Sequence, residues 1–253
     1  MDETLSPAPA AILPTGPMGR INGQISNVRG EDMDAALGRK LVVEAVGAFA
    51  LSFIGVGAII YGGDLTTVAF AHGLVIAVMV CAAGHISGGH FNPAVTFGFL
   101  VTKRIPTTDA VGFWIAQLGG AVLGALAVSL TLPRGVPNIE RGLTQLGPGV
   151  SNGSGLAIEF ILTFFLVFVI FGVAVDPRGS FAAVAGIPIG LTITLDIMMG
   201  GPLTGASMNP SRTFGPDLVA GVWTNVWIYF IACPLGAAAA ALLYEHLILA
   251  HRE

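Results

Sequence analysis

Six runs of apolar residues, each about twenty residues long, constrain this chain more than any other feature of its sequence. A helix needs about 20 mostly apolar residues to cross the hydrocarbon core of a bilayer, because it rises about 1.5 Å per residue. The composition agrees: charged residues make up only 10% of the 253 residues, where a soluble domain carries about 25%. The six predicted spans are residues 41–61, 67–86, 109–132, 155–175, 181–200 and 222–249.

The charged, sulfur-containing and histidine residues argue against several other classes of protein. The formal net charge is only −4 and no basic stripe runs through the sequence, so nucleic-acid binding has no electrostatic support. The two cysteines, Cys81 and Cys233, lie inside apolar runs, where buried free thiols are expected. The five histidines show no metal-ligand spacing and no nucleophile–base pair stands out, so neither a cofactor nor an enzyme is indicated.

The polar N-terminal segment and the basic residues predict how the chain is oriented. Residues 1–38 are rich in proline and glycine and have no apolar core after a basic start, so they predict a disordered cytoplasmic tail rather than a signal peptide. A membrane-spanning domain is then expected at residues 39–253. Lys and Arg favour the cytoplasmic side of a membrane. The side of the N-terminus holds Arg20, Arg29, Arg39, Lys40, Lys103, Arg104, Arg178 and Arg252, and the other side holds Arg134 and Arg141. We expect both termini in the cytoplasm and the protein in the cell membrane (plasma or inner).

Two further apolar segments are too short to cross a membrane, and each begins with Asn-Pro. They are residues 92–101 and 209–220. Asparagine is among the best N-cap residues and proline is favoured at the first helical position, so each pair predicts the start of a helix. A lone Asn-Pro would most often cap an ordinary surface helix. Two copies at matching places in a membrane protein favour a pair of half-helices instead.

An internal repeat relates the two halves of the chain, at about residues 39–132 and 155–250. Glu44 aligns with Glu159, and Asn92 aligns with Asn209 together with several of their neighbours. Each half holds three spans and one short segment. Because three is odd, the halves enter the membrane from opposite sides and the repeat is inverted. Inverted repeats with broken helices near the midplane are typical of a transport pathway.

The glycine-rich stretches before the two Asn-Pro pairs suit an extended chain that dips to the midplane. Their backbone carbonyls would form a polar track, at Gly88, Gly89, His90, Phe91, Gly205, Ala206, Ser207 and Met208. The two helix N-termini would meet there, each with a dipole equivalent to roughly +0.5 charge, and Asn92 and Asn209 would point amide N–H donors into the lumen. A water molecule at this place would turn its oxygen to both asparagines, which breaks a continuous proton wire.

Residues 84–96 (GHISGGHFNPAVT) and 208–216 (MNPSRTFGP) resemble the major intrinsic proteins, the aquaporins and aquaglyceroporins. The resemblance covers about residues 39–250. It implies an all-α membrane protein, a right-handed bundle of six transmembrane helices plus two re-entrant half-helices related as an inverted repeat. It also implies a homotetramer with one pore per subunit and no cofactor. The two motifs are Asn92-Pro93-Ala94 and Asn209-Pro210-Ser211, in which Ser211 replaces the usual alanine.

The same resemblance implies four selectivity-filter residues. Arg212 would donate hydrogen bonds to the solute and repel cations, and its partners would be His72, Ile197 and Ala206. This set looks like that of the plant tonoplast intrinsic proteins. The expected function is a passive channel for water, with ammonia, hydrogen peroxide and urea as further solutes and with protons and ions excluded. A glycerol facilitator is the weaker alternative, because Thr213 follows Arg212 where the glycerol branch typically has Asp.

Glu44, Glu159 and Asp196 lie inside predicted spans and leave alternatives open. Glu44 and Glu159 would either relay protons or ions or accept hydrogen bonds from the re-entrant loops, and the resemblance favours the loops. Asp196, beside Ile197, has no clear role. The rival to a channel is a secondary transporter, since inverted repeats also serve carriers, and a membrane enzyme or a structural junction protein has less support.

Overall fold

The computed structural model describes residues 36–133, 138–179 and 182–249. Most of the predicted tail at residues 1–38 lies outside this part of the chain. The described residues form helices and connecting segments, with no strand among them, and Gly38–Glu253 forms one compact unit. The six predicted spans are confirmed in number. They are Ala36–Ile60, Leu65–Ser87 (α3), Thr107–Thr131 (α5), Asn152–Val175, Gly186–Thr204 (α7) and Val226–Leu249.

Several spans contain a short change of helix type rather than one uniform helix. The first includes a π-helical turn, Ser52–Val56 (η1), before α2 at Gly57–Ile60. The fourth is α6, Asn152–Ile170, continued by η3, Phe171–Val175, and the sixth is α9, Val226–Leu243, continued by η5, Tyr244–Leu249. In each case the π-helical turn is continuous with the α-helix beside it.

The predicted bounds of the fifth span and the predicted start of the sixth are wrong. Apolar residues before Gly186 include a separate 3₁₀ turn, Ala182–Val184 (η4), so α7 begins later than its hydropathy suggests. It also runs past residue 200 and stops only where Gly205 takes a left-handed conformation, with φ +82°, a common way to end a helix. The sixth span begins at Val226 because the turn before it includes a left-handed Asn225.

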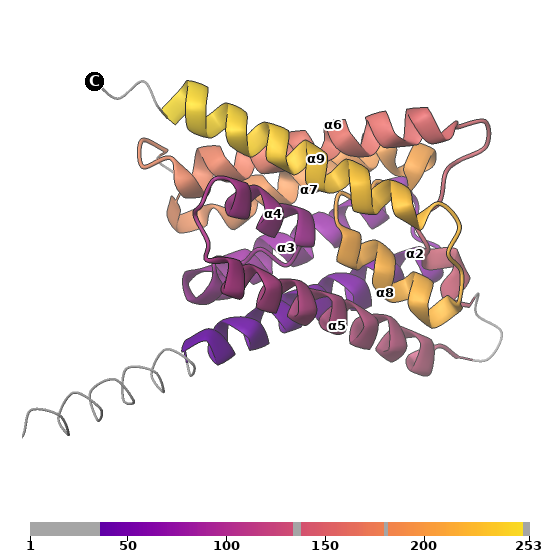
Figure 1. Cartoon of the computed structure of the whole chain (residues 1–253). Helices are drawn as coiled ribbons and strands as arrows, with labels where there is room; N and C mark the ends of the chain where they lie inside the picture. The colour runs from indigo at the N-terminus through magenta and orange to yellow at the C-terminus, as the bar shows by residue number, and fades with distance from the viewer. Residues whose placement is uncertain (1–35, 134–137, 180–181, 250–253) are drawn as a thin grey trace, which may run out of the picture. The chain divides into compact units, whose positions relative to one another are not determined.

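The two short segments form half-helices inside the bundle, α4 at Pro93–Val101 and α8 at Pro210–Ala220. Figure 1 shows both of them among the longer helices. α4, from the first half of the chain, packs against α9, the last span of the second half, and α8 packs against α5, the last span of the first half. The two halves are therefore interlocked, and each half-helix is held in place by the other repeat.

Glycines allow the long helices to approach closely. A Cβ atom on Gly190 of α7 would lie 2.2 Å from the backbone oxygen of Gly73 in α3, and one on Gly120 of α5 would lie 2.1 Å from that of Ala45 in the first span. These distances are shorter than any real contact, so only glycine fits. Small residues at helix contacts are the usual means of packing in lipid, where apolar burial gives no advantage over the acyl chains.

The neighbouring glycines of α5 offer a matched test of this packing. We expect Gly120→Ala to lower the stability of the folded protein by about 1–3 kcal/mol, because α5 must move away from the first span. Gly119→Ala should be neutral or slightly stabilising, since no atom lies within 4 Å of its added Cβ and alanine is the better helix former. Thermal unfolding in detergent would compare the two variants, and equal midpoints would contradict the proposed contact.

Candidate functional site: the central channel

Glu44 of the first span accepts hydrogen bonds from the first re-entrant loop. Its Oε1 atom accepts from the backbone N–H of His90 at 2.9 Å and from Ser87 Oγ at 2.7 Å. Its Oε2 atom accepts from the backbone N–H of Phe91 at 2.6 Å and from Gln117 Nε2 at 2.8 Å. Glu44 is fully buried, so these donors would otherwise have no partner inside the bilayer.

Glu159 of α6 makes the matching set of contacts in the second loop. It accepts from the backbone N–H groups of Ser207 at 2.9 Å and Met208 at 2.8 Å, and from Thr204 Oγ1 at 2.6 Å. It is also fully buried. Because the oxygens of both glutamates accept hydrogen bonds from the loops, the geometry supports a role as hydrogen-bond acceptors for the loops rather than as a proton or ion relay.

The backbone of the two loops repeats a costly conformation at matching positions. Left-handed φ angles occur at Gly88, Gly89, Phe91, Gly205, Ala206 and Met208. For a residue with a side chain, this conformation costs roughly 1–2 kcal/mol. Phe91 has φ +50° and Met208 has φ +53°, and both donate their N–H groups to a buried glutamate. The glutamates therefore hold the loops in a shape that the backbone alone would not favour.

The two asparagines cross at the place where the half-helices begin. Asn92 Nδ2 donates to the backbone oxygen of Met208 at 2.8 Å, and Asn209 Nδ2 donates to that of Phe91 at 3.0 Å. Each amide nitrogen carries two N–H groups, so one of each remains for a molecule in the lumen. The carbonyls of Phe91 and Met208, expected to serve the polar track, each accept one of these bonds and keep a second lone pair.

Both asparagines also cap their own half-helix, and Pro93 and Pro210 occupy its first position. Asn92 Oδ1 accepts from the N–H of Ala94 at 2.8 Å. Asn209 Oδ1 accepts from the N–H of Ser211 at 3.0 Å and from its hydroxyl at 2.8 Å. The serine in place of the usual alanine thus adds a hydrogen bond that orients the Asn209 amide.

Arg212 and His72 are brought together from the second half-helix and α3. Arg212 Nη1 donates to the backbone oxygen of Gly142 at 3.1 Å, and Nη2 lies 3.4 Å from His72 Nε2. The other ring nitrogen, Nδ1, lies 2.8 Å from the backbone oxygen of Val68. A carbonyl can only accept, so Nδ1 carries the proton and Nε2 accepts from the arginine, which makes the imidazole neutral.

Two cavities meet at these residues. The inner one, of about 60 Å³, is lined by Asn92, Asn209 and Ala206, and by every predicted track residue except Gly205. The outer one, of about 370 Å³, is lined by Gly205 among others. His72, Ile197 and Arg212 line both, so these three side chains form the partition between the two cavities.

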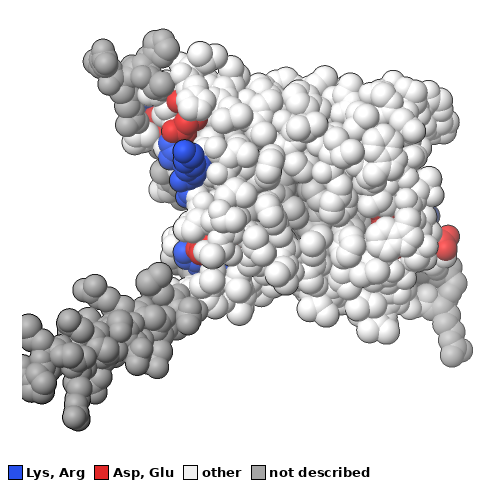
Figure 2. Space-filling model, in the orientation of Figure 1, with Lys and Arg blue, Asp and Glu red and all other residues white. Residues whose placement is uncertain are grey.

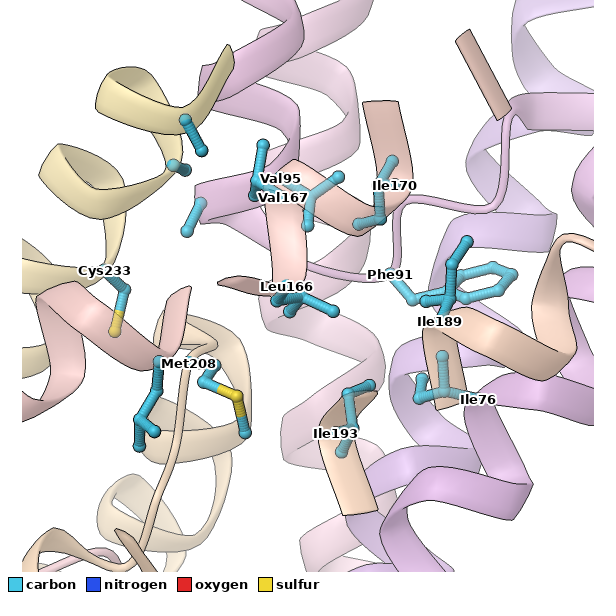
Figure 3. Close-up of a cluster of buried hydrophobic side chains, with 14 of the residues drawn as sticks. Ile76, Phe91, Val95, Leu166, Val167, Ile170, Ile189, Ile193, Met208 and Cys233 are labelled. Carbon is cyan, nitrogen blue, oxygen red and sulfur yellow. The ribbon is translucent and has the colours of Figure 1, made fainter. Parts of the chain in front are cut away.

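The wall of the inner cavity is mostly apolar. Its lining includes Ile76, Val95, Leu166, Ile189 and Ile193, and Figure 3 shows these five in one cluster of buried apolar side chains. At roughly 10–15 Å³ per water in this kind of volume, the inner cavity of about 60 Å³ has room for about four to six water molecules. An apolar wall offers these waters few hydrogen bonds, so the polar groups at the asparagines and at Arg212 decide how they are oriented.

Several residues of the site were not found from the sequence. Ser87 and Thr204 each bond a glutamate, and each stands directly before the glycine that starts the loop, so the repeat itself carried the signal. Gly55 lies against the filter, since a Cβ there would be 2.4 Å from His72 Nε2. Gln117 and the carbonyl of Gly142 had no local signal, because their partners are distant in the sequence.

Asp196 is buried and its Oδ2 atom has no hydrogen-bond partner among the residues that the structure describes; nothing in the structure explains it.

Six spans that enclose two half-helices, with a lumen where their N-termini meet, define a membrane channel. Comparison with known proteins gives the family. The chain matches the major intrinsic proteins over residues 32–244, and it belongs to this family.

The similar proteins are aquaporins, mostly of two plant types. The chain is 46% identical to "Probable aquaporin TIP3-2" of Arabidopsis thaliana, over 74% of this chain and 69% of that protein. It is 40% identical to "Aquaporin TIP4-4" of Zea mays, over 87% and 90% of the two chains, and 44% identical to "Nodulin-26" of Glycine max, over 82% and 77%. The aquaglyceroporin from Plasmodium falciparum has the same fold, with a TM-score of 0.73 over 84% of this chain and 97% of that one, at 24% identity.

The similarity to TIP-type aquaporins and the family match identify a TIP-like aquaporin, a channel for water and small neutral solutes. The family consists of channels and not of enzymes. The resemblance to the major intrinsic proteins, seen in the two Asn-Pro motifs, is therefore confirmed, and the expected fold is confirmed with it.

Replacing one buried glutamate tests whether it holds its loop. We expect Glu159→Gln to lower stability by about 1–3 kcal/mol and to reduce water flux, because the amide nitrogen cannot accept from the N–H of Ser207 or Met208. Glu140→Gln is the control, since Glu140 is exposed in the outer connection. Thermal unfolding in detergent and stopped-flow light scattering in vesicles would measure both quantities. Unchanged flux and stability in Glu159→Gln would show that the loop does not depend on this carboxylate.

Proposed function

We propose that this channel passes ammonia, hydrogen peroxide and urea beside water, and that it excludes protons and ions. The observation that carries the proposal is the pair of crossed asparagines, each with one N–H group left at the meeting point of two half-helix N-termini. A water there accepts from both amides, so its own hydrogens point away along the lumen in both directions. The chain of waters cannot then pass a proton straight through, and the two positive helix ends repel cations.

The partition between the two cavities supports the solute range. Arg212 supplies a fixed positive charge and N–H donors, which suit a neutral solute with an oxygen or nitrogen acceptor and repel cations. Opposite it, Ile197 and Ala206 offer no hydrogen-bonding group, and both are buried. An aliphatic and a very small side chain in these places remove bulk and polarity, so selection for water alone is relaxed.

Two alternatives have less support. A glycerol facilitator is not favoured, because Thr213 follows Arg212 and the similarity to the Plasmodium aquaglyceroporin concerns the fold alone. A secondary transporter would need charged groups that couple an ion to the solute. In the described part of the spans, Glu44 and Glu159 are engaged by the loops, and Asp109 and Glu245 pair with Lys40 and Arg104 at the span ends. This leaves Asp196 as the acid inside them without a partner for its Oδ2 atom.

The solute range is tested by a panel of fluxes in vesicles. We expect purified protein to raise ammonia permeability several-fold above the lipid background, along with water permeability, because the partition lacks a third polar group beside Arg212 and His72. Stopped-flow measurements with a pH-sensitive dye inside the vesicles would follow ammonia. Rapid water flux with ammonia at the background of empty vesicles would reject the wider range.

Two substitutions at the partition separate charge from size. We expect Arg212→Val to keep water flux but to raise cation and proton leakage, since the fixed charge is lost. His72→Phe should lower urea and ammonia flux more than water flux, because a bulkier ring narrows the partition. If neither variant changed cation or size discrimination, Arg212 and His72 would not be filter residues.

The basic residues and the family resemblance indicate how the protein is oriented in the membrane and how many copies assemble. We infer that the N- and C-termini face the cytoplasm, because basic residues concentrate on that side, and that four copies assemble, as the family resemblance implies. The protein is a multi-pass membrane protein. The cell membrane expected from the sequence conflicts with the TIP-type relatives, since the tonoplast is an internal membrane.

A further inference from the structure

Basic side chains exceed acidic ones at one end of the molecule. Each acid that forms an ion pair there holds one cation, in the pairs Lys40–Asp109, Arg104–Glu245 and Arg178–Asp176. Hydrogen bonds from Arg178 hold the pKa of Asp176 below its ordinary value, so this acid is ionised and balances its partner. Arg39 and Lys103 have no ion-pair partner within the residues described. Figure 2 shows the blue side chains gathered at one end, beside a flank that is almost entirely uncharged.

Lys103, one of these two cations without an ion-pair partner in the described part of the chain, borders a cavity. Lys103 and Arg104 stand beside a hollow of about 360 Å³ between the end of α4 and the start of α5, and Leu100, Ile105 and Pro106 form its apolar side. Lys103 is exposed and its backbone is left-handed, with φ +57°. The N–H groups of Lys103 and Arg104 are bonded to the end of α4. The hollow is therefore a fixed part of the connection.

The hollow has a cationic side and an apolar side, and its position places both at the surface of the membrane. It lies where one helix of the bundle ends and a spanning helix begins, which is the level of the lipid headgroups. A soluble anion would gain from Lys103 but not from the apolar side. A phospholipid gains from both, since its headgroup meets the cation while its chains lie along apolar side chains, and anionic lipids are attracted by about 1 kcal/mol per interfacial Lys or Arg.

We propose that the hollow between α4 and α5 binds the headgroup of an anionic phospholipid, with Lys103 as the cation that recognises it. Arg104 contributes less, because its Nε and Nη2 atoms are engaged by Glu245 at 2.7 and 3.0 Å. The lipid would join the end of α4 to the start of α5. Since α4 carries Asn92 at its other end, a lipid here stabilises the half-helix from the membrane surface.

Thermal unfolding of the full-length protein in detergent tests the site with three additions: phosphatidylglycerol, phosphatidylcholine and inorganic phosphate. We expect phosphatidylglycerol to raise the unfolding midpoint by several degrees and phosphatidylcholine and phosphate to have little effect. Lys103→Gln should need about fivefold more phosphatidylglycerol for the same rise, the equivalent of ~1 kcal/mol. Arg141→Gln is the matched control, an exposed cation of the outer connection.

The outcomes separate a lipid site from its alternatives. Lys103→Gln should keep the midpoint and the water flux of the parent without added lipid, because its side chain is exposed and far from the partition at Arg212. An equal rise with inorganic phosphate would mean a site for soluble anions, and an equal rise with phosphatidylcholine would mean general solvation by lipid. Either result, or an unchanged lipid response in Lys103→Gln, would overturn the proposal.

Discussion

Backbone that leaves a helix inside a bilayer finds no water to bond with, and in this protein two glutamates on spanning helices supply the missing acceptors. Glu44 and Glu159 each bond two consecutive loop N–H groups and one hydroxyl. The left-handed residues, the meeting of the half-helices and the placing of the asparagine amides all follow from these contacts. A carboxylate buried at such depth is costly by itself, so glutamate and loop stabilise each other and neither is stable alone.

The filter depends on the same kind of mutual support, but across helices. Arg212 is held by the carbonyl of Gly142 from the long outer connection, and the ring of His72 is set by Val68 one turn earlier on α3. Gly55 leaves the space that the imidazole occupies. The position of the charge is thus fixed by three separate segments, and a change in any of them would move the guanidinium relative to the solute path.

Much of this arrangement was predictable from the sequence, for identifiable reasons. Hydropathy predicts the spans, and the capping preferences of Asn-Pro predict where the half-helices start. The six spans and the positions of α4 and α8 therefore followed directly from the sequence. The ends of α7 and α9 did not, because a left-handed Gly205 or Asn225 stops or starts a helix without changing hydropathy. Contacts such as Gln117 with Glu44 join residues far apart in the chain, and no local pattern encodes them. The crossed bonds from Asn92 and Asn209 to opposite carbonyls needed the three-dimensional meeting of both loops.

The exchange of half-helices between the repeats has a consequence for how the protein is made. α4 lies in the first half of the chain, yet the helix it packs against, α9, is the last span to leave the ribosome. Until then one flank of α4 has no permanent neighbour. The first half therefore stays incompletely packed in the membrane, and the translocation machinery or lipid must contact the unpaired flank of α4 until α9 is inserted. Truncated chains that end before α9 should consequently be substrates for membrane quality control rather than half-sized channels.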